Sequence, residues 1–136
     1  MPDALEGAIT AIDHVQLTIP EGDEHLAEAR RCYVDVLGMT EVEKPAPLQS
    51  RGGAWFEAGP PAARFQVHLG VEARLETRRH PAFVTRDLDA LRARCEAAGY
   101  RTQDDVPLVG RRRFHLWDPF GNRIELLQWT EAPFEV

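Results

Sequence analysis

The chain has little cysteine. Only two of its 136 residues are Cys, and Cys32 and Cys95 lie far apart with no Cys-x-x-Cys spacing. Both fall in segments with helical spacing of apolar residues. We therefore interpret them as core thiols, in preference to a catalytic pair or a disulfide.

Basic residues are also few relative to acidic ones. Lys and Arg total 16 and Asp and Glu total 22, so the formal net charge is -6. Phosphate backbones are bound by clustered Lys and Arg, so this balance argues against a nucleic-acid surface. The two dense basic runs, Arg78–Arg79 and Arg111–Arg113, are interpreted as solvated strand ends or loops. Arg113 is the exception, because strand alternation places it with His115 and Trp117, where it could anchor an anionic substrate.

Long hydrophobic runs are absent from the sequence. No apolar stretch reaches the length of a membrane span, and the acidic start of the chain does not have the pattern of a signal peptide. We expect a cytoplasmic protein with no membrane partner. The length and the balance of apolar and charged residues predict one globular domain over residues 1–136.

The sequence contains the same order of predicted elements twice: a strand, a helix and three extended segments. Residues 12–19 alternate as a strand, with His14, Gln16 and Thr18 on a polar face. A helix follows, with a cap expected at Asp23 and an end at Gly38. Three extended segments complete this module of about residues 9–70, at residues 40–44, 54–58 and 64–70.

The second module, of about residues 80–129, has the same order. A short strand over residues 80–85 is followed by a helix that Asp87 caps and Gly99 ends. Extended segments are predicted at residues 100–106, 113–117 and 123–129. The turn Asp118-Pro119-Phe120-Gly121-Asn122 has the composition of a tight hairpin turn before the last strand.

Two tandem βαβββ modules, each opening on a His, resemble the vicinal oxygen chelate superfamily of glyoxalases, extradiol dioxygenases, fosfomycin-resistance transferases and bleomycin-binding proteins. The most specific motifs are residues 12–15 (IDHV), 33–39 (YVDVLGM), 87–91 (DLDAL) and 118–125 (DPFGNRIE). The resemblance implies an α+β fold in which the two modules form a half-barrel around a central cavity.

Internal symmetry gives a candidate site. His14 and His80 open equivalent first strands, and a one-residue gap between the two hairpins superimposes His68 on Glu125. Neutral imidazoles and a carboxylate are ligands of divalent first-row metals, and burying them costs free energy unless an ion or hydrogen bonds compensate. We therefore predict that His14, His68, His80 and Glu125 converge as a metal site.

The resemblance implies the same ligands at positions 14, 80 and 125. Position 68 departs from it, because glyoxalases usually carry a Glu there. It also implies a divalent ion, which we expect to be Zn, Ni, Co, Fe or Mn, and a homodimer. Glu125 is assigned as the catalytic base as well as a ligand.

Four further residues are weaker candidates for contacting a substrate. Trp55 and Trp117 fall at comparable places in their modules and could wall the cavity, and Arg113 and His115 share a strand face with Trp117. Core packing explains the two Trp residues equally well.

The family theme is chelation of an ion by two oxygens of a small substrate, which leaves lyase, isomerase and oxygenase chemistry open. A dioxygenase needs two His and one carboxylate, and a fourth ligand at His68 would fill a position it needs. A thiol transferase of the fosfomycin-resistance kind and a drug-binding protein without chemistry are the alternatives.

Overall fold

A computed structural model describes residues 12–72 and 80–130 of the chain. In the first half the elements are β1 (His14–Ile19), α1 (Asp23–Arg30), the π-helix η1 (Arg31–Val36), β2 (Thr40–Val42), the 3-10 helix η2 (Ala46–Arg51), β3 (Ala54–Ala58) and β4 (Phe65–Val71). In the second half they are β5 (Ala82–Val84), α2 (Leu88–Ala97), β6 (Thr102–Gln103), β7 (Arg111–Trp117) and β8 (Arg123–Trp129). Arg78 and Arg79 lie outside the described residues.

The strands form two four-stranded sheets of equivalent topology. Their orders are β1-β4-β3-β2 and β5-β8-β7-β6, so in each sheet the first strand lies parallel to the last. The remaining neighbours are antiparallel. The predicted α+β fold of two tandem βαβββ modules is confirmed, and β1 and β5 are edge strands that each pair with one other strand in the described part of the chain.

Helix boundaries follow local chemistry. The Oδ1 atom of Asp87 accepts a hydrogen bond from the backbone N–H of Ala90 at 3.1 Å, which confirms the predicted cap of α2. The predicted cap at Asp23 is wrong, because Gly22 holds the N-cap position and Asp23 is already helical. Gly38 ends the first helix in a left-handed conformation with φ 75°, as predicted.

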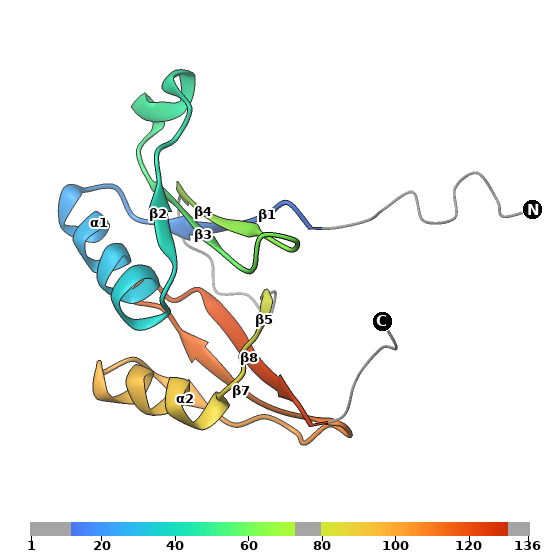
Figure 1. Ribbon diagram of the computed structural model, residues 1–136. Helices are drawn as coiled ribbons and strands as arrows, with labels where there is room; N and C mark the ends of the chain where they lie inside the picture. Colours follow the sequence, from blue (N-terminus) through green and yellow to red (C-terminus); the bar gives the residue numbers. More distant parts are fainter. Residues whose placement is uncertain (1–11, 73–79, 131–136) are drawn as a thin grey trace, which may run out of the picture.

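One segment carries an element that the sequence analysis did not predict, and a second is shorter than predicted. The stretch 46–51 forms a 3-10 turn, which begins with Pro45 at its N-cap and carries Pro47 in its first turn. This turn projects beyond β2 and β3 in Figure 1. The extended segment expected over 100–106 contains only the two-residue strand β6, because exposed Asp104 and Asp105 begin a loop that returns to β7.

The helices cover one face of the sheets, on the left in Figure 1. There the buried ring of Tyr33 on η1 stacks on Phe56 of β3 with centroids 5.2 Å apart. Cys32 and Cys95 are fully buried free thiols in this layer, as predicted. Burial raises the pKa of Cys95 to about 11, so this thiol is unreactive at neutral pH.

The hairpin turn before β8 ties the two modules together. The buried carboxylate of Asp118 accepts hydrogen bonds from the Tyr33 hydroxyl at 2.8 Å and from the backbone N–H groups of Phe120 and Asn122. The Asn122 side chain in turn donates to the carbonyl oxygen of Thr18 at 2.7 Å and accepts from the Thr18 N–H at 3.1 Å. The Asn122 side chain thereby makes with Thr18 of β1 the two hydrogen bonds that a residue of a neighbouring strand would make.

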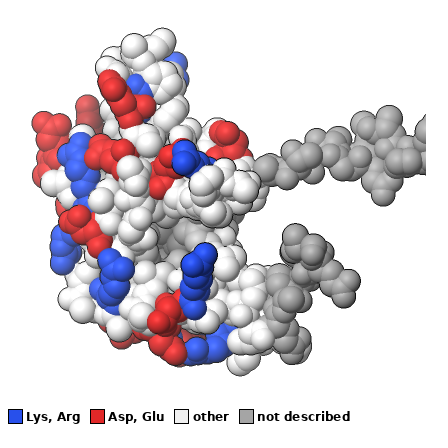
Figure 2. All heavy atoms as spheres, in the orientation of Figure 1, with Lys and Arg blue, Asp and Glu red and all other residues white. Residues whose placement is uncertain are grey.

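The surface carries both signs of charge. Figure 2 shows acidic and basic side chains interspersed on this face, with no extended basic area. No helix within residues 12–72 and 80–130 combines the length and apolarity needed to span a membrane.

Candidate metal and substrate site

Strand register places the predicted site residues at equivalent positions. His68 lies opposite Gln16 in β1, and Glu125 lies opposite Ala82 in β5, so position 68 superimposes on position 125 as predicted. His14 and His80 each precede those partners by two residues and are equivalent too. The same registers pair Trp55 with His68 and His115 with Glu125, so the equivalent of Trp55 is His115 and not Trp117.

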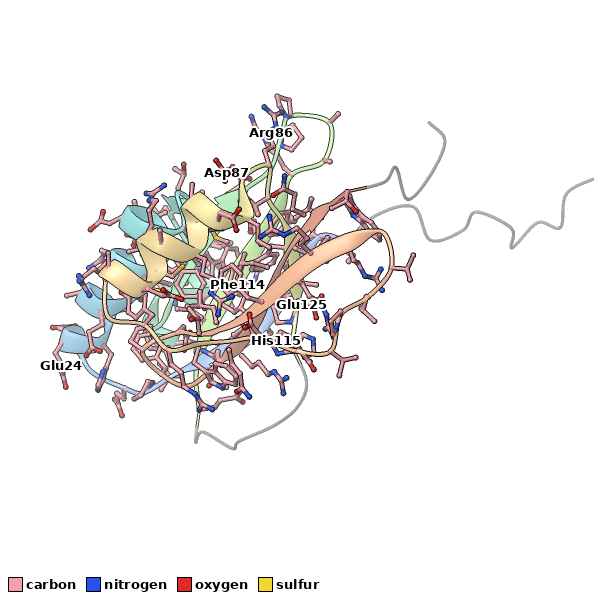
Figure 3. All side chains as sticks on the ribbon, turned by 90° about the horizontal axis from the view of Figure 1, so that it is seen from below. Glu24, Arg86, Asp87, Phe114, His115 and Glu125 are labelled. Atoms are coloured by element: carbon pink, nitrogen blue, oxygen red, sulfur yellow. The ribbon has the colours of Figure 1, made fainter. Side chains whose placement is uncertain are left out.

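The second module brings three possible metal donors together. One donor atom from each of His80, His115 and Glu125 lies within 4.8 Å of the others, and no other group of three or more such donors occurs among the described residues. Figure 3 shows His115 and Glu125 side by side on neighbouring strands. Phe114, the residue before His115, is turned to the other face, where Arg92 of α2 lies over its ring.

Glu125 is the centre of this group. Its Oε1 atom lies 3.2 Å from Nε2 of His80, 3.3 Å from Nε2 of His115 and 3.0 Å from Nη1 of Arg113. Its Oε2 atom receives no hydrogen bond from any residue that the structure describes. Burial alone would raise the pKa of Glu125, but the hydrogen bonds from Arg113 and His80 outweigh it, so the pKa is lowered. Glu125 is therefore a carboxylate at neutral pH with one oxygen open.

The pKa of Glu125 gives a test of this arrangement. Because it lies below the ordinary value of 4.5, the charged form stabilises the fold above that pH and the contribution is lost as the pH falls through the folded-state pKa. We expect Arg113→Gln to raise the pKa of Glu125, because it removes the guanidinium and leaves the burial. NMR titration of the Glu125 carboxyl carbon measures it, with Arg112→Gln on the face of β7 that faces α2 as the control. An unchanged pKa in Arg113→Gln would contradict the assignment.

His115 is held in the wrong tautomer to bind a metal through Nε2. The Nε of Arg123 donates a hydrogen bond to Nδ1 of His115 at 2.6 Å. A guanidinium always carries its protons, so Nδ1 must accept and the neutral imidazole has its hydrogen on Nε2. Burial and the neighbouring Arg123 charge lower the pKa of His115, which keeps it neutral. His115 thus acts as a donor toward Glu125.

The predicted ligands of the first module form a separate group. The ring of His68 is stacked between Trp55, with centroids 3.7 Å apart, and His14, with centroids 4.1 Å apart. The Nε2 atom of His68 lies 2.8 Å from Oε1 of Gln66, to which it donates. Burial, then the neighbouring His14, lowers the pKa of His68, so this ring is neutral.

His14 has the opposite arrangement from His115. Its Nδ1 atom lies 2.8 Å from a carboxylate oxygen of Asp13, so in the neutral imidazole Nδ1 carries the hydrogen and Nε2 keeps its lone pair. Imidazoles that bind metals through Nε2 are usually oriented by this kind of hydrogen bond from Nδ1. The side chain of His14 is 44% exposed on the edge strand β1, and its Nε2 has no hydrogen-bond partner among the described residues.

The structure therefore brings together two pairs of the four predicted ligands. His80 lies with Glu125, and His14 lies with His68. The four donors do not form one group within 4.8 Å in the described part of the chain. Of the weaker candidates, Trp55 contacts His68, and Arg113 and His115 contact Glu125. The ring of Trp117 lies 6.4 Å from that of His115 and stacks against the guanidinium of Arg101 at 4.1 Å.

Two residues of this site were not expected from the sequence. Arg123 holds His115, and one carboxylate oxygen of Asp105 lies 3.5 Å from both Arg113 and His115 and 3.7 Å from Arg123. Period-two alternation places Arg123 on the face of Glu125, so this signal was available. Asp105 lies on a loop, where alternation gives no direction.

The donor distances at His80 and Glu125 are compatible with an ion. With ligands at about 2.1 Å, neighbouring donors around an octahedral or tetrahedral ion are about 3.0 to 3.4 Å apart. The 3.2 Å between Nε2 of His80 and Oε1 of Glu125 falls in this range. His80 and Glu125 therefore fit a metal once Nε2 of His80 has given up the hydrogen that it donates to Glu125, whereas His115 fits only if Arg123 releases it.

Comparisons with known proteins agree with this architecture. The family model described as Glyoxalase/Bleomycin resistance protein/Dioxygenase superfamily matches residues 11–126. A glyoxalase family protein from Bacillus anthracis is 37% identical, with 96% of this chain and 100% of that chain covered and a TM-score of 0.79. No curated protein matches the chain with significance. The chain belongs to the glyoxalase, bleomycin resistance and dioxygenase superfamily.

More distant structures share the fold alone. The fosfomycin resistance protein FosX from Listeria monocytogenes, in complex with Mn(II) and a sulfate ion, is 17% identical, covers 90% of this chain and 92% of its own, and has a TM-score of 0.66. TnmS3, an antibiotic binding protein from Streptomyces sp. CB03234, is 22% identical, with coverages of 90% and 98% and a TM-score of 0.60.

Proposed function

We propose that this chain is a metal-dependent enzyme that acts on a small oxygenated substrate through a divalent ion held at His80 and Glu125. The observation that carries the proposal is the open Oε2 of an ionised, mostly buried Glu125 beside the imidazole of His80. When bound, such an ion would supply Lewis acidity toward two oxygens of a substrate.

The third protein ligand in this proposal is His14 of a second copy of the chain. His80 and Glu125 supply two donors, and stable sites of this kind use three or more. His14 has a free Nε2 oriented by Asp13 and stands on an edge strand. In a dimer, His14 of one chain would lie beside His80 and Glu125 of the other. This would explain why His14, which is oriented like a metal ligand, lies away from Glu125 in a single chain. Homodimerisation and a location in the cytoplasm are parts of this proposal.

His68 and His115 have supporting roles in this proposal. His68 is sandwiched between two rings and donates its Nε2–H to Gln66. His115 donates toward Glu125, so it holds the carboxylate in place. Removing either side chain should change the orientation of a metal ligand and leave the number of ligands to the ion unchanged.

Glu125 is also the proposed proton acceptor. Its lowered pKa makes it a weak base at neutral pH, because Arg113 and His80 stabilise the charged form. It is therefore suited to a substrate whose proton is already acidic, such as one beside a carbonyl group. Isomerase and lyase reactions that begin by removing such a proton therefore fit this site. The identity of the metal, among Zn, Ni, Co, Fe and Mn, would decide whether oxygen chemistry is also possible.

Replacing Glu125 tests the proposal. We expect Glu125→Gln to weaken binding of Mn(II) or Ni(II) to the chelator-treated protein by about 100-fold or more, because the amide has no charge and loses the open carboxylate oxygen. Calorimetric titration of wild type and variant measures this affinity. Glu57→Gln on β3, a carboxylate of the first module, is the control and should bind like wild type. Equal affinity of Glu125→Gln and wild type would refute the site.

One observation favours a second candidate, a small-molecule binding protein without chemistry. Arg113 already compensates the charge of Glu125 at 3.0 Å, so the carboxylate has a partner in the absence of an ion. In that case removal of metal would leave ligand affinity unchanged. Ligand affinity that depends on added metal would exclude this candidate.

A further inference from the structure

One carboxylate oxygen of Asp105 is surrounded by three nitrogens from the strands beside Glu125. Its Oδ2 atom lies 3.5 Å from Nη2 of Arg113, 3.5 Å from Nε2 of His115 and 3.7 Å from Nη2 of Arg123. Hydrogen bonds between a guanidinium and a carboxylate are normally about 2.7 to 2.9 Å long. Asp105 is therefore attracted to this position without satisfying any of the three donors.

The donors themselves have unused capacity. The Nε atom of Arg113 is buried and has no hydrogen-bond partner in the described structure. The whole side chain is only 12% exposed. Neither terminal nitrogen of Arg123 donates a hydrogen bond shorter than 3.5 Å to a described residue, and its Nε is used by His115. Buried guanidinium N–H groups normally find acceptors, so this arrangement lacks an acceptor with more than one oxygen.

The position of Asp105 makes it replaceable. It lies on the loop between β6 and β7, its side chain is 34% exposed, and its tether to the site is this single oxygen. In contrast, Arg113, His115 and Arg123 stand on paired strands, with Arg113 fixed by Glu125 and by the carbonyl oxygen of Val106 at 2.9 Å. The three donors are held by paired strands, whereas Asp105 is held by the hydrogen bond that its other oxygen accepts from the backbone N–H of Val106 at 2.7 Å.

We propose that Arg113 and Arg123, beside His115, form a binding site for an oxyanion, the carboxylate, phosphate or phosphonate group of a small molecule, and that Asp105 occupies it in the free protein. An anion with two or three oxygens can meet at hydrogen-bond distance the donors that one Asp105 oxygen reaches only at 3.5 Å or more. The anion displaces Asp105 because both carry negative charge and compete for the same donors.

Charge balance sets the substrate class. With Asp105 in place, the two arginines are balanced by Asp105 and Glu125, whereas its departure leaves one uncompensated positive charge, which an anionic group would neutralise. As regards the substrate, the inference rests on the proposed function: the oxyanion would be one end of the molecule whose other oxygens face His80 and Glu125. The anion site itself requires no metal.

Inorganic phosphate is the probe, added to the chelator-treated full chain while the ring resonances of His115 and Trp117 are followed by NMR. We expect wild type to bind phosphate, Asp105→Asn to bind it about tenfold more tightly, and Arg123→Gln to bind it about tenfold more weakly. Arg112 of β7 and Asp89 of α2 form an ion pair at 2.6 Å on the face of the sheet that faces α2. Arg112→Gln and Asp89→Asn should therefore bind phosphate like wild type.

Three results would overturn the proposal: no gain in Asp105→Asn, no loss in Arg123→Gln, or an equal loss in Arg112→Gln. Absence of phosphate binding in Asp105→Asn would do the same. Each measurement is made without metal, so failure here leaves the metal titration of Glu125→Gln untouched. Conversely, phosphate binding with no metal affinity would retain the anion site and remove the metal site.

Discussion

Mixing the His14→Ala and His80→Ala variants should restore metal binding to about a quarter of the sites, although each variant alone binds almost no metal. The reason is that each site takes His14 from one chain and His80 from the other. After random exchange about half of the dimers are mixed. In a mixed dimer one site combines both Ala substitutions and the other has both histidines.

Metal content of the mixture after unfolding, refolding and dialysis gives the measurement. The control is a mixture of His80→Ala with Glu125→Gln, which should restore nothing because both ligands belong to the same chain's half of the site. No recovery in the His14 and His80 mixture would contradict a site shared between two chains. Full metal binding by His14→Ala alone would remove His14 from the site.

Asp118→Ala should lower the free energy of unfolding by about 3 to 5 kcal/mol. The carboxylate is 4% exposed and accepts from the Tyr33 hydroxyl and from the backbone N–H groups of Phe120 and Asn122. Removing it leaves these donors buried without a partner, at about 1 to 3 kcal/mol each before relaxation. The turn that orients Asn122 toward β1 is weakened at the same time.

Urea unfolding of wild type and variant measures this difference, with two controls. Tyr33→Phe removes one of the hydrogen bonds and should cost less than Asp118→Ala, about 1 to 2 kcal/mol. Asp89→Ala removes an exposed carboxylate and should cost much less than either of the other substitutions. If Asp118→Ala were no less stable than Asp89→Ala, the turn would not be the link between the modules.

Much of the fold follows from periodicity in the sequence. The ranges of β3 and β8 match the predicted strands, because both lie between clear turn residues and carry period-two or buried apolar patterns. Segment 46–51 was not predicted as a helical turn, because prolines are as common in loops as in the first turn of a helix. β6 is shorter than predicted, since the two aspartates after it favour a loop over a ladder.

The site was predictable where symmetry applied. The equivalence of His14 with His80, and of His68 with Glu125, came from the repeat and agrees with the strand register. The distance between the two pairs was not predictable, because alternation gives the face of a sheet and not the separation of two sheets. Tautomers were not predictable either: Asp13 and Arg123 set them by contacts that only the folded chain makes.

Elemental analysis of the protein purified without a His-tag or chelator, beside Glu125→Gln, shows whether the chain carries a metal at His80 and Glu125. We expect about one equivalent of a transition metal per chain in wild type and almost none in the variant. A wild-type protein without metal, even after reconstitution at neutral pH, would contradict it. His80 and Glu125 would then be an internal ion pair of a small-molecule binding protein.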